Sequence, residues 1–256
     1  MIKMLCQVPR KPGMSEAEFY PRYRHRHGDL VRSHAQDMAF LRYVQAHRID
    51  VPEISGFLAG HRWRSPLDGQ SELWWESWES METALGSPKG GIASAILEED
   101  EQAFTDTVNV SGFVAQEEVI FDHSDGLPPG QGPAVKMVID IWKHADLSGA
   151  EFSARWRTKH ADLIRQHASA LGISKYVQNH RDPAAKFDFA ELRGWRPAPD
   201  GVAEMWWPNI EAMRHALASP DAIAAAAAIR QDEDAFTDQS LTRAFAAKEH
   251  SIFDFV

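Results

Sequence analysis

The chain has 256 residues, of which 44% are hydrophobic and 25% charged, a composition typical of a folded protein with a core. Its formal net charge of −10 argues against binding to nucleic acid or to an anionic membrane, because both require excess basic side chains. No apolar stretch reaches the roughly 18–20 residues that span a bilayer, and residues 1–13 lack the apolar centre of a signal peptide. Cys6, the only cysteine, excludes an internal disulfide, and we expect a cytoplasmic protein.

The sequence contains two copies of one pattern. At an offset of 133, Tyr43-Val-Gln-Ala-His47-Arg48 falls on Tyr176-Val-Gln-Asn-His180-Arg181, and from residue 63 onward the copies align at an offset of 132. A single one-residue shift over nearly the whole chain indicates two related domains, rather than a solenoid of many short units. We predict domains at 1–122 and 134–256, joined by a Pro- and Gly-rich linker at 123–133.

Both copies predict the same elements in the same order. In the first copy they are a buried strand at 2–8, a helix from Ser15 to about 37, strands at 40–48 and 71–78, a helix from Ser87-Pro88, and a strand at 112–121. In the second copy they are 135–142, Ser148 to about 170, 173–181, 202–207, Ser219-Pro220 onward, and 247–255. Ser15-x-x-Glu18 and Ser148-x-x-Glu151 match the capping box, which predicts a helix start at each position.

The order strand, helix, strand, strand, helix, strand predicts an α+β fold made of two ferredoxin-like units. In such a unit the helices cover one face of a four-stranded antiparallel sheet, and the other face is apolar and needs a cover. Two units in one chain can cover each other, sheet against sheet. This gives a physical reason for the duplication.

The motifs of the repeat resemble those of a known family. A first strand followed by S-x-x-E-F, R-x-x-H, Y-V-Q-x-H and D-G-x-x-E-x-W-W occurs twice, and this series resembles the EthD domain. The resemblance implies the fold of the dimeric α+β barrel superfamily, formed here within one chain. Members of that superfamily include isomerases, cyclases, dehydratases, quinone-forming monooxygenases and haem enzymes. The fold therefore leaves the reaction open.

A histidine on the first helix of each copy is the first catalytic candidate. In the first copy the helix places five residues on one face, the face toward the sheet: Phe19, Tyr23, His27, Leu30 and His34. Imidazole titrates near neutral pH, so His27 and its counterpart His160 are candidates for a general acid or base. The alternative is a buried histidine bonded to a carbonyl group. The resemblance favours the catalytic role, because isomerases of the superfamily use a histidine near this place.

The second strand of each copy supplies further candidates. Because side chains alternate along a strand, Tyr43, Gln45 and His47 share one face, and the second copy repeats this with Tyr176, Gln178 and His180. Three polar side chains in a row on a sheet face indicate a polar pocket, unless they point to solvent at an edge. By resemblance, the tyrosines lie in the active pocket beside the helix histidine. We expect Tyr43, His47, Tyr176 and His180 to be catalytic, and Gln45 and Gln178 to bind substrate.

Two arginines are further candidates for substrate binding. Arg24 and Arg157 precede the helix histidines by one turn and could hold a carboxylate or an enolate oxygen, or equally pair with a surface glutamate. Glu72 and Glu204, each before a tryptophan pair, could orient a pocket histidine or lie at a solvated strand end. The histidine spacing does not suit a zinc site, and the chain lacks a nucleotide-binding motif, so we expect neither metal nor cofactor.

These observations predict a cofactor-independent lyase or isomerase, of dehydratase, hydratase or cyclase type, that moves protons on an apolar oxygenated small molecule. The helix histidine would be the base, and the strand tyrosine would polarise a carbonyl oxygen. The alternatives are a cofactor-free monooxygenase, a haem-binding barrel protein, or a non-enzymatic accessory protein of a degradation pathway. Association into a homo-oligomer stays open.

Overall fold

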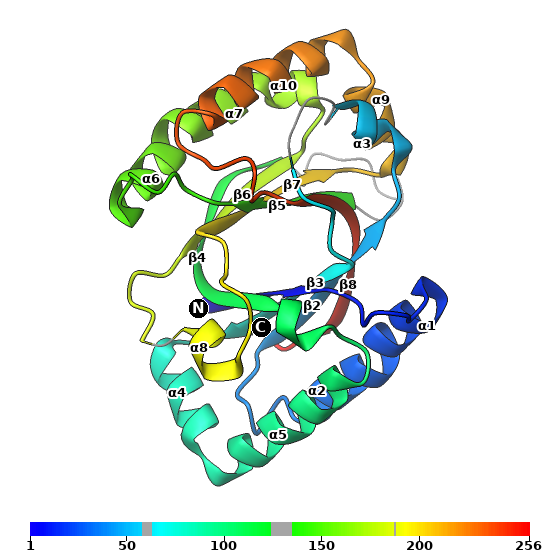
Figure 1. Cartoon of the computed structure of the whole chain (residues 1–256), viewed down its shortest axis with the longest axis vertical. Helices are drawn as coiled ribbons and strands as arrows, with labels where there is room; N and C mark the ends of the chain where they lie inside the picture. The colour runs from blue at the N-terminus through cyan, green and yellow to red at the C-terminus, as the bar shows by residue number, and fades with distance from the viewer. Residues whose placement is uncertain (58–62, 124–134, 187) are drawn as a thin grey trace.

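Eight antiparallel strands form a closed barrel with helices packed outside it in two groups (Figure 1). The computed structural model describes residues 1–57, 63–123, 135–186 and 188–256. The strands of the first half are β1 (Ile2–Val8), β2 (Arg42–Ile49), β3 (Gly69–Trp75) and β4 (Ser111–Asp122). Those of the second half are β5 (Val135–Ile141), β6 (Lys175–Arg181), β7 (Gly201–Trp207) and β8 (Ala244–Asp254). Of the predicted linker, only His123 lies within the described residues.

The two halves close the barrel by pairing with each other. Around the barrel the order is β1-β3-β2-β8-β5-β7-β6-β4, so each half contributes four neighbouring strands. The long strands β4 and β8 join the halves, β8 to β2 with Gln45 opposite His250, and β4 to β6 with Glu118 opposite Gln178. The predicted intramolecular barrel is therefore confirmed.

The first long helix of each half has a π-helical turn in its middle. It comprises α1 (Glu16–Pro21), the π turn Arg22–His27 and α2 (Gly28–Ser33) in the first half. In the second half it comprises α6 (Gly149–Arg155), the π turn Trp156–His160 and α7 (Ala161–Leu171). Both predicted capping boxes are present, with Ser15 and Ser148 at the N-caps.

The π turn corrects the helix face expected from the sequence. A π turn holds more residues per turn than an α-helix, so every position after it rotates relative to the α-helical spacing. After His27 the buried positions are Val31 and Ala35, whereas Leu30 and His34, expected on that face, are only partly buried. The sequence pattern alone contains no sign of this shift.

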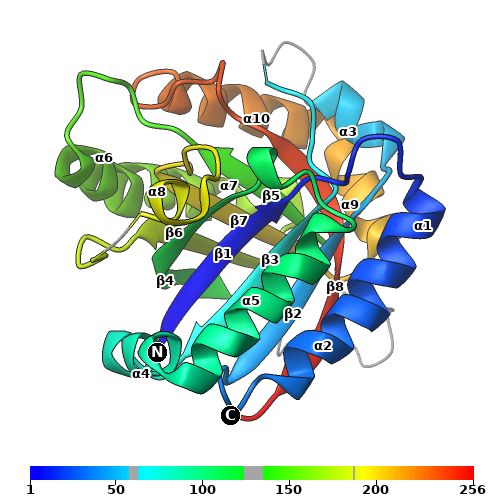
Figure 2. The ribbon, with the colours of Figure 1, turned by 60° about the horizontal axis from the view of Figure 1, so that its bottom comes forward.

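The second predicted helix of each half is also confirmed, as α5 (Pro88–Gln102) and α10 (Pro220–Glu233), each with a serine N-cap and proline in the first turn. Four shorter helices were not expected from the sequence: α3 (Pro52–Phe57), α4 (Trp78–Gly86), α8 (Phe189–Arg193) and α9 (Ile210–Leu217). Helices α2 and α5 lie side by side over the outer face of the first-half strands (Figure 2). In the part of the chain that the structure describes, no helix meets the length and apolarity of a membrane span.

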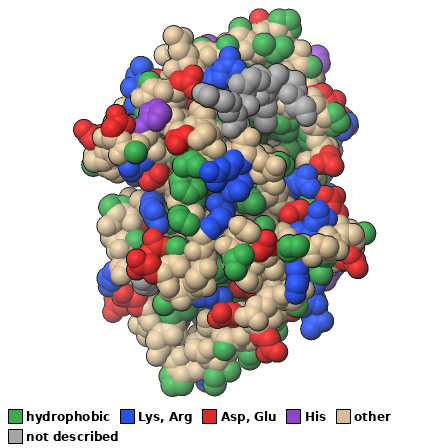
Figure 3. All heavy atoms as spheres, viewed as in Figure 1, with side chains coloured by type: hydrophobic (Ala, Val, Ile, Leu, Met, Phe, Trp, Pro, Cys, Tyr) green, Lys and Arg blue, Asp and Glu red, His purple; other side chains and the backbone are tan. Residues whose placement is uncertain are grey.

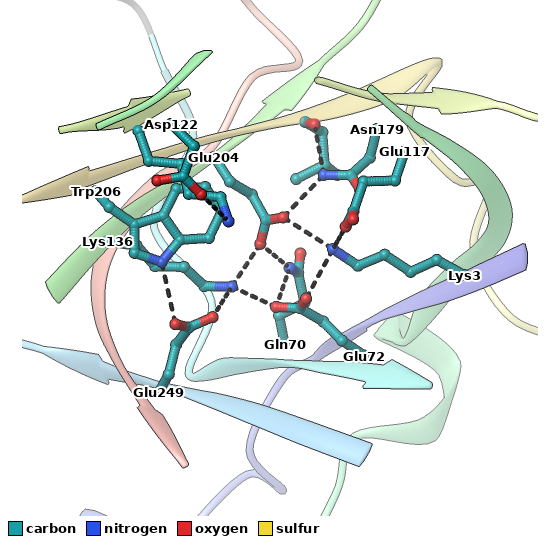
Figure 4. A network of polar contacts seen from close by, with 12 residues as sticks. Lys3, Gln70, Glu72, Glu117, Asp122, Lys136, Asn179, Glu204, Trp206 and Glu249 are labelled. Carbon is teal, nitrogen blue, oxygen red and sulfur yellow. Dashed lines mark hydrogen bonds and ion pairs between the residues drawn. The ribbon is translucent and has the colours of Figure 1, made fainter. Parts of the chain in front are cut away.

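Acidic and basic side chains are interspersed over the surface seen in Figure 3. The barrel interior is charged as well, which corrects the expectation of two apolar sheet faces. Lys3 Nζ lies 2.8 Å from Glu72 and 3.0 Å from Glu204, and Lys136 Nζ contacts both glutamates (Figure 4). All four side chains are at most 3% exposed. Glu72 and Glu204 thus bind the buried lysines of both halves, and neither orients a pocket histidine nor lies at a solvated strand end.

Candidate functional site

Each half holds a cavity between its helices and the outer face of its strands. The first-half cavity has a volume of about 110 Å³, and its walls include Tyr23, His27, Tyr43, Ser71 and Glu101. The second-half cavity, of about 40 Å³, is lined at equivalent positions by His160, Tyr176, Ala203 and Glu233, whereas Trp156, at the position of Tyr23, is not part of its wall. The predicted pairs of helix histidine and strand tyrosine therefore lie at a common cavity wall in both halves.

Each cavity is completed by residues from the opposite half. Phe189, Arg193 and Trp195, from the segment between β6 and β7, line the first-half cavity, and Trp63, from the corresponding segment of the first half, lines the second. Arg193, at the end of α8, pairs with Glu98 and Glu101 of helix α5 in the first half. Neither cavity wall is complete within one half of the chain.

His27 is held by a carboxylate on the neighbouring helix. Its Nδ1 lies 3.1 Å from Oδ2 of Asp100, and Arg22 Nη2 donates to Oδ1 of the same carboxylate at 2.6 Å. The hydrogen bond from His27, together with the charge of Arg22, lowers the pKa of Asp100, so this carboxylate is ionised. An ionised carboxylate only accepts hydrogen bonds, so it keeps the proton on Nδ1 and leaves Nε2 as the basic nitrogen.

The same arrangement occurs in the second half. His160 Nδ1 lies 3.1 Å from Asp232 on α10, and Arg155 Nη2 donates to that carboxylate at 2.7 Å. The hydrogen bond from His160 is the main cause that lowers the pKa of Asp232. Both halves therefore contain an oriented histidine–aspartate pair.

Three hydroxyl groups form a cluster on the strand side of the first-half cavity. Ser71 Oγ lies 2.7 Å from the Tyr23 hydroxyl and 3.1 Å from the Tyr43 hydroxyl. Burial raises the pKa of both phenols, so they are neutral and can donate. The ring centroids of His27 and Tyr43 are 6.4 Å apart. A molecule in the cavity would therefore contact an imidazole and a hydroxyl donor together.

The two glutamines, predicted to bind substrate, instead bind the π turns. Gln45 Nε2 donates at 2.8 Å to the carbonyl oxygen of Tyr23, and Gln178 Nε2 donates at 2.8 Å to that of Trp156. Both side chains are fully buried and also reach a tyrosine hydroxyl, Gln45 that of Tyr43 at 2.9 Å. They hold the irregular part of the helix, where the histidine lies, against the strand.

The strand histidines lie away from the cavity walls. His47 Nε2 donates at 3.0 Å to Oε1 of Gln45, and its ring stacks on those of Tyr20 and Tyr23. His180 bonds Gln178 at 2.9 Å and the hydroxyl of Ser153 at 2.9 Å. Their place in the structure is that of buried, hydrogen-bonded histidines that support the glutamines.

This burial predicts a pH dependence of stability. Desolvation lowers the pKa of His47 and of His180 from 6.5 to about 3. Between these pH values the unfolded chain binds protons that the folded chain does not, so the free energy of unfolding falls as the pH is lowered. We expect the variant His47→Gln/His180→Gln to lose less stability than the native chain between pH 6.5 and pH 4, measured by urea unfolding. Equal losses in both proteins would contradict the assignment.

The two arginines predicted to bind substrate do not line the cavities. Arg24 is exposed on the π turn. Arg157 donates through Nε to Glu118 of β4 at 2.6 Å, the surface pairing that the sequence left open as the alternative. Arg22 and Arg155, two residues earlier in each copy, hold the aspartates instead.

Sequence reasoning missed the acidic pair beside each helix histidine. Asp100-Glu101 and Asp232-Glu233 each stand just before a repeated Ala-Phe-Thr-Asp, so Asp-Glu-x-Ala-Phe-Thr-Asp recurs at the offset of 132. An exact repeat of two acidic residues was the signal that could have found them. Acidic side chains on a helix are ordinarily solvated. Their partners become visible only in the structure, where α5 and α10 each pack on the first long helix of their own half.

The buried glutamates of the two cavities differ in their surroundings. Glu101 is bound by Arg193 of the opposite half, whose Nη2 lies 3.0 Å from it. For Glu233 the nearest donor among the described residues is Gln239, at 3.5 Å, and burial raises its pKa to about 7. The described residues contain no group of three or more metal-ligating side chains.

Three solved structures align with nearly the whole chain at low identity. A protein of Lactobacillus acidophilus, provisionally assigned as a monooxygenase, is 8% identical over 97% of this chain and 93% of its own, with a TM-score of 0.47. A second provisional monooxygenase, from Fusobacterium nucleatum, is 10% identical over 98% and 92%, with a TM-score of 0.48. A mutant chlorite dismutase from Candidatus Nitrospira defluvii is 10% identical over 98% and 92%, with a TM-score of 0.47. No curated protein sequence matches the chain.

At these identities and TM-scores the three structures support no conclusion about the activity of this chain. The sequence profile of the EthD domain, in contrast, matches the chain twice, over residues 11–108 and 144–240. The matches cover most of the chain and correspond to the two halves of the barrel. The chain therefore belongs to the EthD domain family, as a tandem of two such domains in one barrel.

Proposed function

We propose that the first-half cavity is the active site of an enzyme that removes a proton from a small, apolar, oxygenated molecule. The observation that carries this proposal is His27 at the wall of an apolar cavity, with Asp100 bonded to its Nδ1 from outside the wall. Asp100 fixes the imidazole and stabilises the positive charge that His27 gains when Nε2 takes a proton. The rest of the wall is mainly aliphatic, aromatic and sulfur-containing, which favours an apolar substrate.

In the proposed reaction His27 Nε2 first accepts a proton from the substrate and finally gives it up again. Nε2 takes a proton from a carbon or oxygen of the substrate, and the electron pair moves to the substrate oxygen near the hydroxyl cluster. Return of the proton at another atom gives isomerisation, and loss of a leaving group gives elimination. Both routes need an acid–base group and no change of oxidation state.

A second candidate, cofactor-free oxygenation, starts with the same proton transfer. The anion formed at His27 would be oxidised by dissolved oxygen instead of being protonated. The enclosed apolar wall, with Met4, Met38 and Trp75, favours this candidate, because molecular oxygen is itself apolar. The two candidates differ in whether turnover consumes oxygen.

Haem, the third alternative, does not fit the cavity as it stands. His27 has the chemistry of an axial ligand, because its other ring nitrogen is bonded to a carboxylate. A cavity of about 110 Å³ is nevertheless smaller than the roughly 300–1,000 Å³ that even drug-sized ligands occupy. We therefore derive no step through haem.

The division into two ferredoxin-like domains, 1–122 and 134–256, remains part of this proposal and is supported by the strand order of each half.

The test compares His27→Ala with its matched control His160→Ala on a panel of lactones, cyclic enones and phenols. Products are followed by mass spectrometry in deuterated water, with dissolved oxygen recorded in parallel. We expect deuterium uptake that falls about 10²–10⁴-fold in His27→Ala. Turnover without oxygen consumption indicates the lyase or isomerase, and stoichiometric consumption indicates the monooxygenase. Unchanged turnover in a folded His27→Ala protein would refute the assignment.

A further inference from the structure

We propose that the chain binds one single-ring hydroxylated molecule, in the first-half cavity alone, with the ligand oxygen on the hydroxyl cluster of Tyr23, Ser71 and Tyr43. This inference names the substrate class of the proposed active site and rests on that proposal for its catalytic meaning. The second copy of the site keeps its histidine–aspartate pair but takes no ring-sized ligand.

The volumes of the two cavities support a single ring and a single site. An apolar protein cavity of about 150 Å³ holds a benzene molecule, whereas one water needs only about 10–15 Å³. The first-half cavity, about 110 Å³, is close to the size of one ring. The second, about 40 Å³, has room for little more than water.

Substitutions between the copies explain the difference in volume. Tyr23 is replaced by Trp156, whose larger ring lies against the backbone of Gly201 and 4.3 Å from the His180 ring. Within the cavity wall itself, Ile139 stands where the first half has Cys6, and Ile164 stands where it has Val31. Both isoleucines add side-chain volume at equivalent positions of the wall.

A count of protons shows that the hydroxyl cluster keeps one donor for a ligand. Three hydroxyl groups carry three protons, and the two contacts between them use two. Gln45 donates to the Tyr43 hydroxyl and so supplies no acceptor for the third proton. Among the described residues no other acceptor contacts these groups, and all three line the cavity. A ligand oxygen in the cavity would accept this third proton, which has no strong acceptor within the cluster.

The second cavity has no such cluster. Ala203 takes the place of Ser71, and the Trp156 indole has no hydroxyl. The remaining Tyr176 hydroxyl accepts from Trp156 Nε1 at 3.3 Å and from Gln178 Nε2 at 3.4 Å. The hydroxyl cluster is thus confined to the first half; the Tyr176 O–H remains a donor in the second half, but the cavity there has no room for a ring.

The test is a titration of the full chain with phenol and with benzene by isothermal calorimetry. We expect one phenol per chain. In Tyr23→Phe/Ser71→Ala/Tyr43→Phe phenol affinity should fall about 10-fold, which corresponds to one lost hydrogen bond, while benzene affinity stays within about twofold. The matched control Tyr176→Phe removes a hydroxyl from the other cavity and should change neither affinity.

Circular dichroism establishes whether the triple variant is folded, because Tyr43→Phe also removes an acceptor from the buried Gln45 amide. If that variant does not fold, Ser71→Leu, which fills the cavity, should abolish phenol binding. Two phenols per chain, loss of affinity in Tyr176→Phe, or no phenol binding would each overturn the inference. One bound phenol with unchanged turnover in His27→Ala would instead refute the proposed function and leave the binding inference intact.

Discussion

Replacing Lys136 by methionine is expected to lower the free energy of unfolding by about 3–5 kcal/mol, the usual effect of removing one partner from a buried ion pair. Lys136 is fully buried inside the barrel and contacts Glu72, Glu204 and Glu249. Burial alone would lower the pKa of Lys136, but attraction by these carboxylates raises it well above its ordinary value. Methionine would leave the carboxylates in the interior with Lys3 as their remaining lysine.

Urea unfolding of the native and variant chains at neutral pH measures this loss. The matched control is Lys175→Met, because Lys175 pairs with Asp122 in a bridge whose side chains are about one-third exposed. Exposed pairs contribute about 0–1 kcal/mol, so the control should remain close to the native chain. A loss below about 1 kcal/mol in Lys136→Met would show that the interior network does not hold the barrel together.

The network also explains how the duplicated halves are joined. Lys3 of the first half binds Glu204 of the second at 3.0 Å, and Lys136 of the second half binds Glu72 of the first. Gln70 and Asn179 add hydrogen bonds to the same carboxylates, at 3.0 Å and 2.9 Å from Glu204. Removal of a charge from one half therefore takes one counter-charge from a buried side chain of the other half, and the stability of the two halves is coupled.

The sequence predicted the barrel because two aligned copies of the same pattern support each predicted strand and helix. The capping serines, the order of strands and the duplication itself depend on local patterns, which one sequence contains. The π turns were not predictable, because a shift of hydrogen bonds from i−4 to i−5 needs no particular residue type. That single shift displaced the helix face expected after His27, so that Val31 and Ala35 are buried in place of Leu30 and His34.

The candidate site was predictable only where its residues come from regular elements. His27 and Tyr43 were found because helical and strand periods place them on inward faces. Asp100 was missed because a carboxylate on an amphipathic helix is ordinarily solvated, and its pairing with His27 depends on how two helices pack. Arg193 was missed for a stronger reason: it comes from the opposite half and reaches the cavity through the closure of the barrel.

Asp100→Asn is expected to reduce kcat of the proposed reaction about 10²–10⁴-fold while KM changes little. Asparagine keeps the size of aspartate but carries no charge, so it cannot stabilise the imidazolium that forms when His27 takes a proton. Asp100 is a positioning residue that does not line the cavity, and substrate binding should therefore be preserved. The measurement is steady-state kinetics with the substrate identified by the deuterium experiment.

Asp232→Asn distinguishes this role from a structural one. Asp232 makes the same contacts as Asp100, to a histidine at 3.1 Å and to an arginine at 2.7 Å, so both variants should lose similar stability. If Asp100 acts through His27 at the working cavity, only Asp100→Asn should lower kcat, and Asp100→Glu should restore part of it. Equal losses of kcat in the two asparagine variants would mean that both cavities turn over substrate, or that the effect follows stability. The two carboxylates make similar contacts and differ mainly in the cavity next to their histidine. The comparison therefore tests directly whether the first-half cavity alone is catalytic.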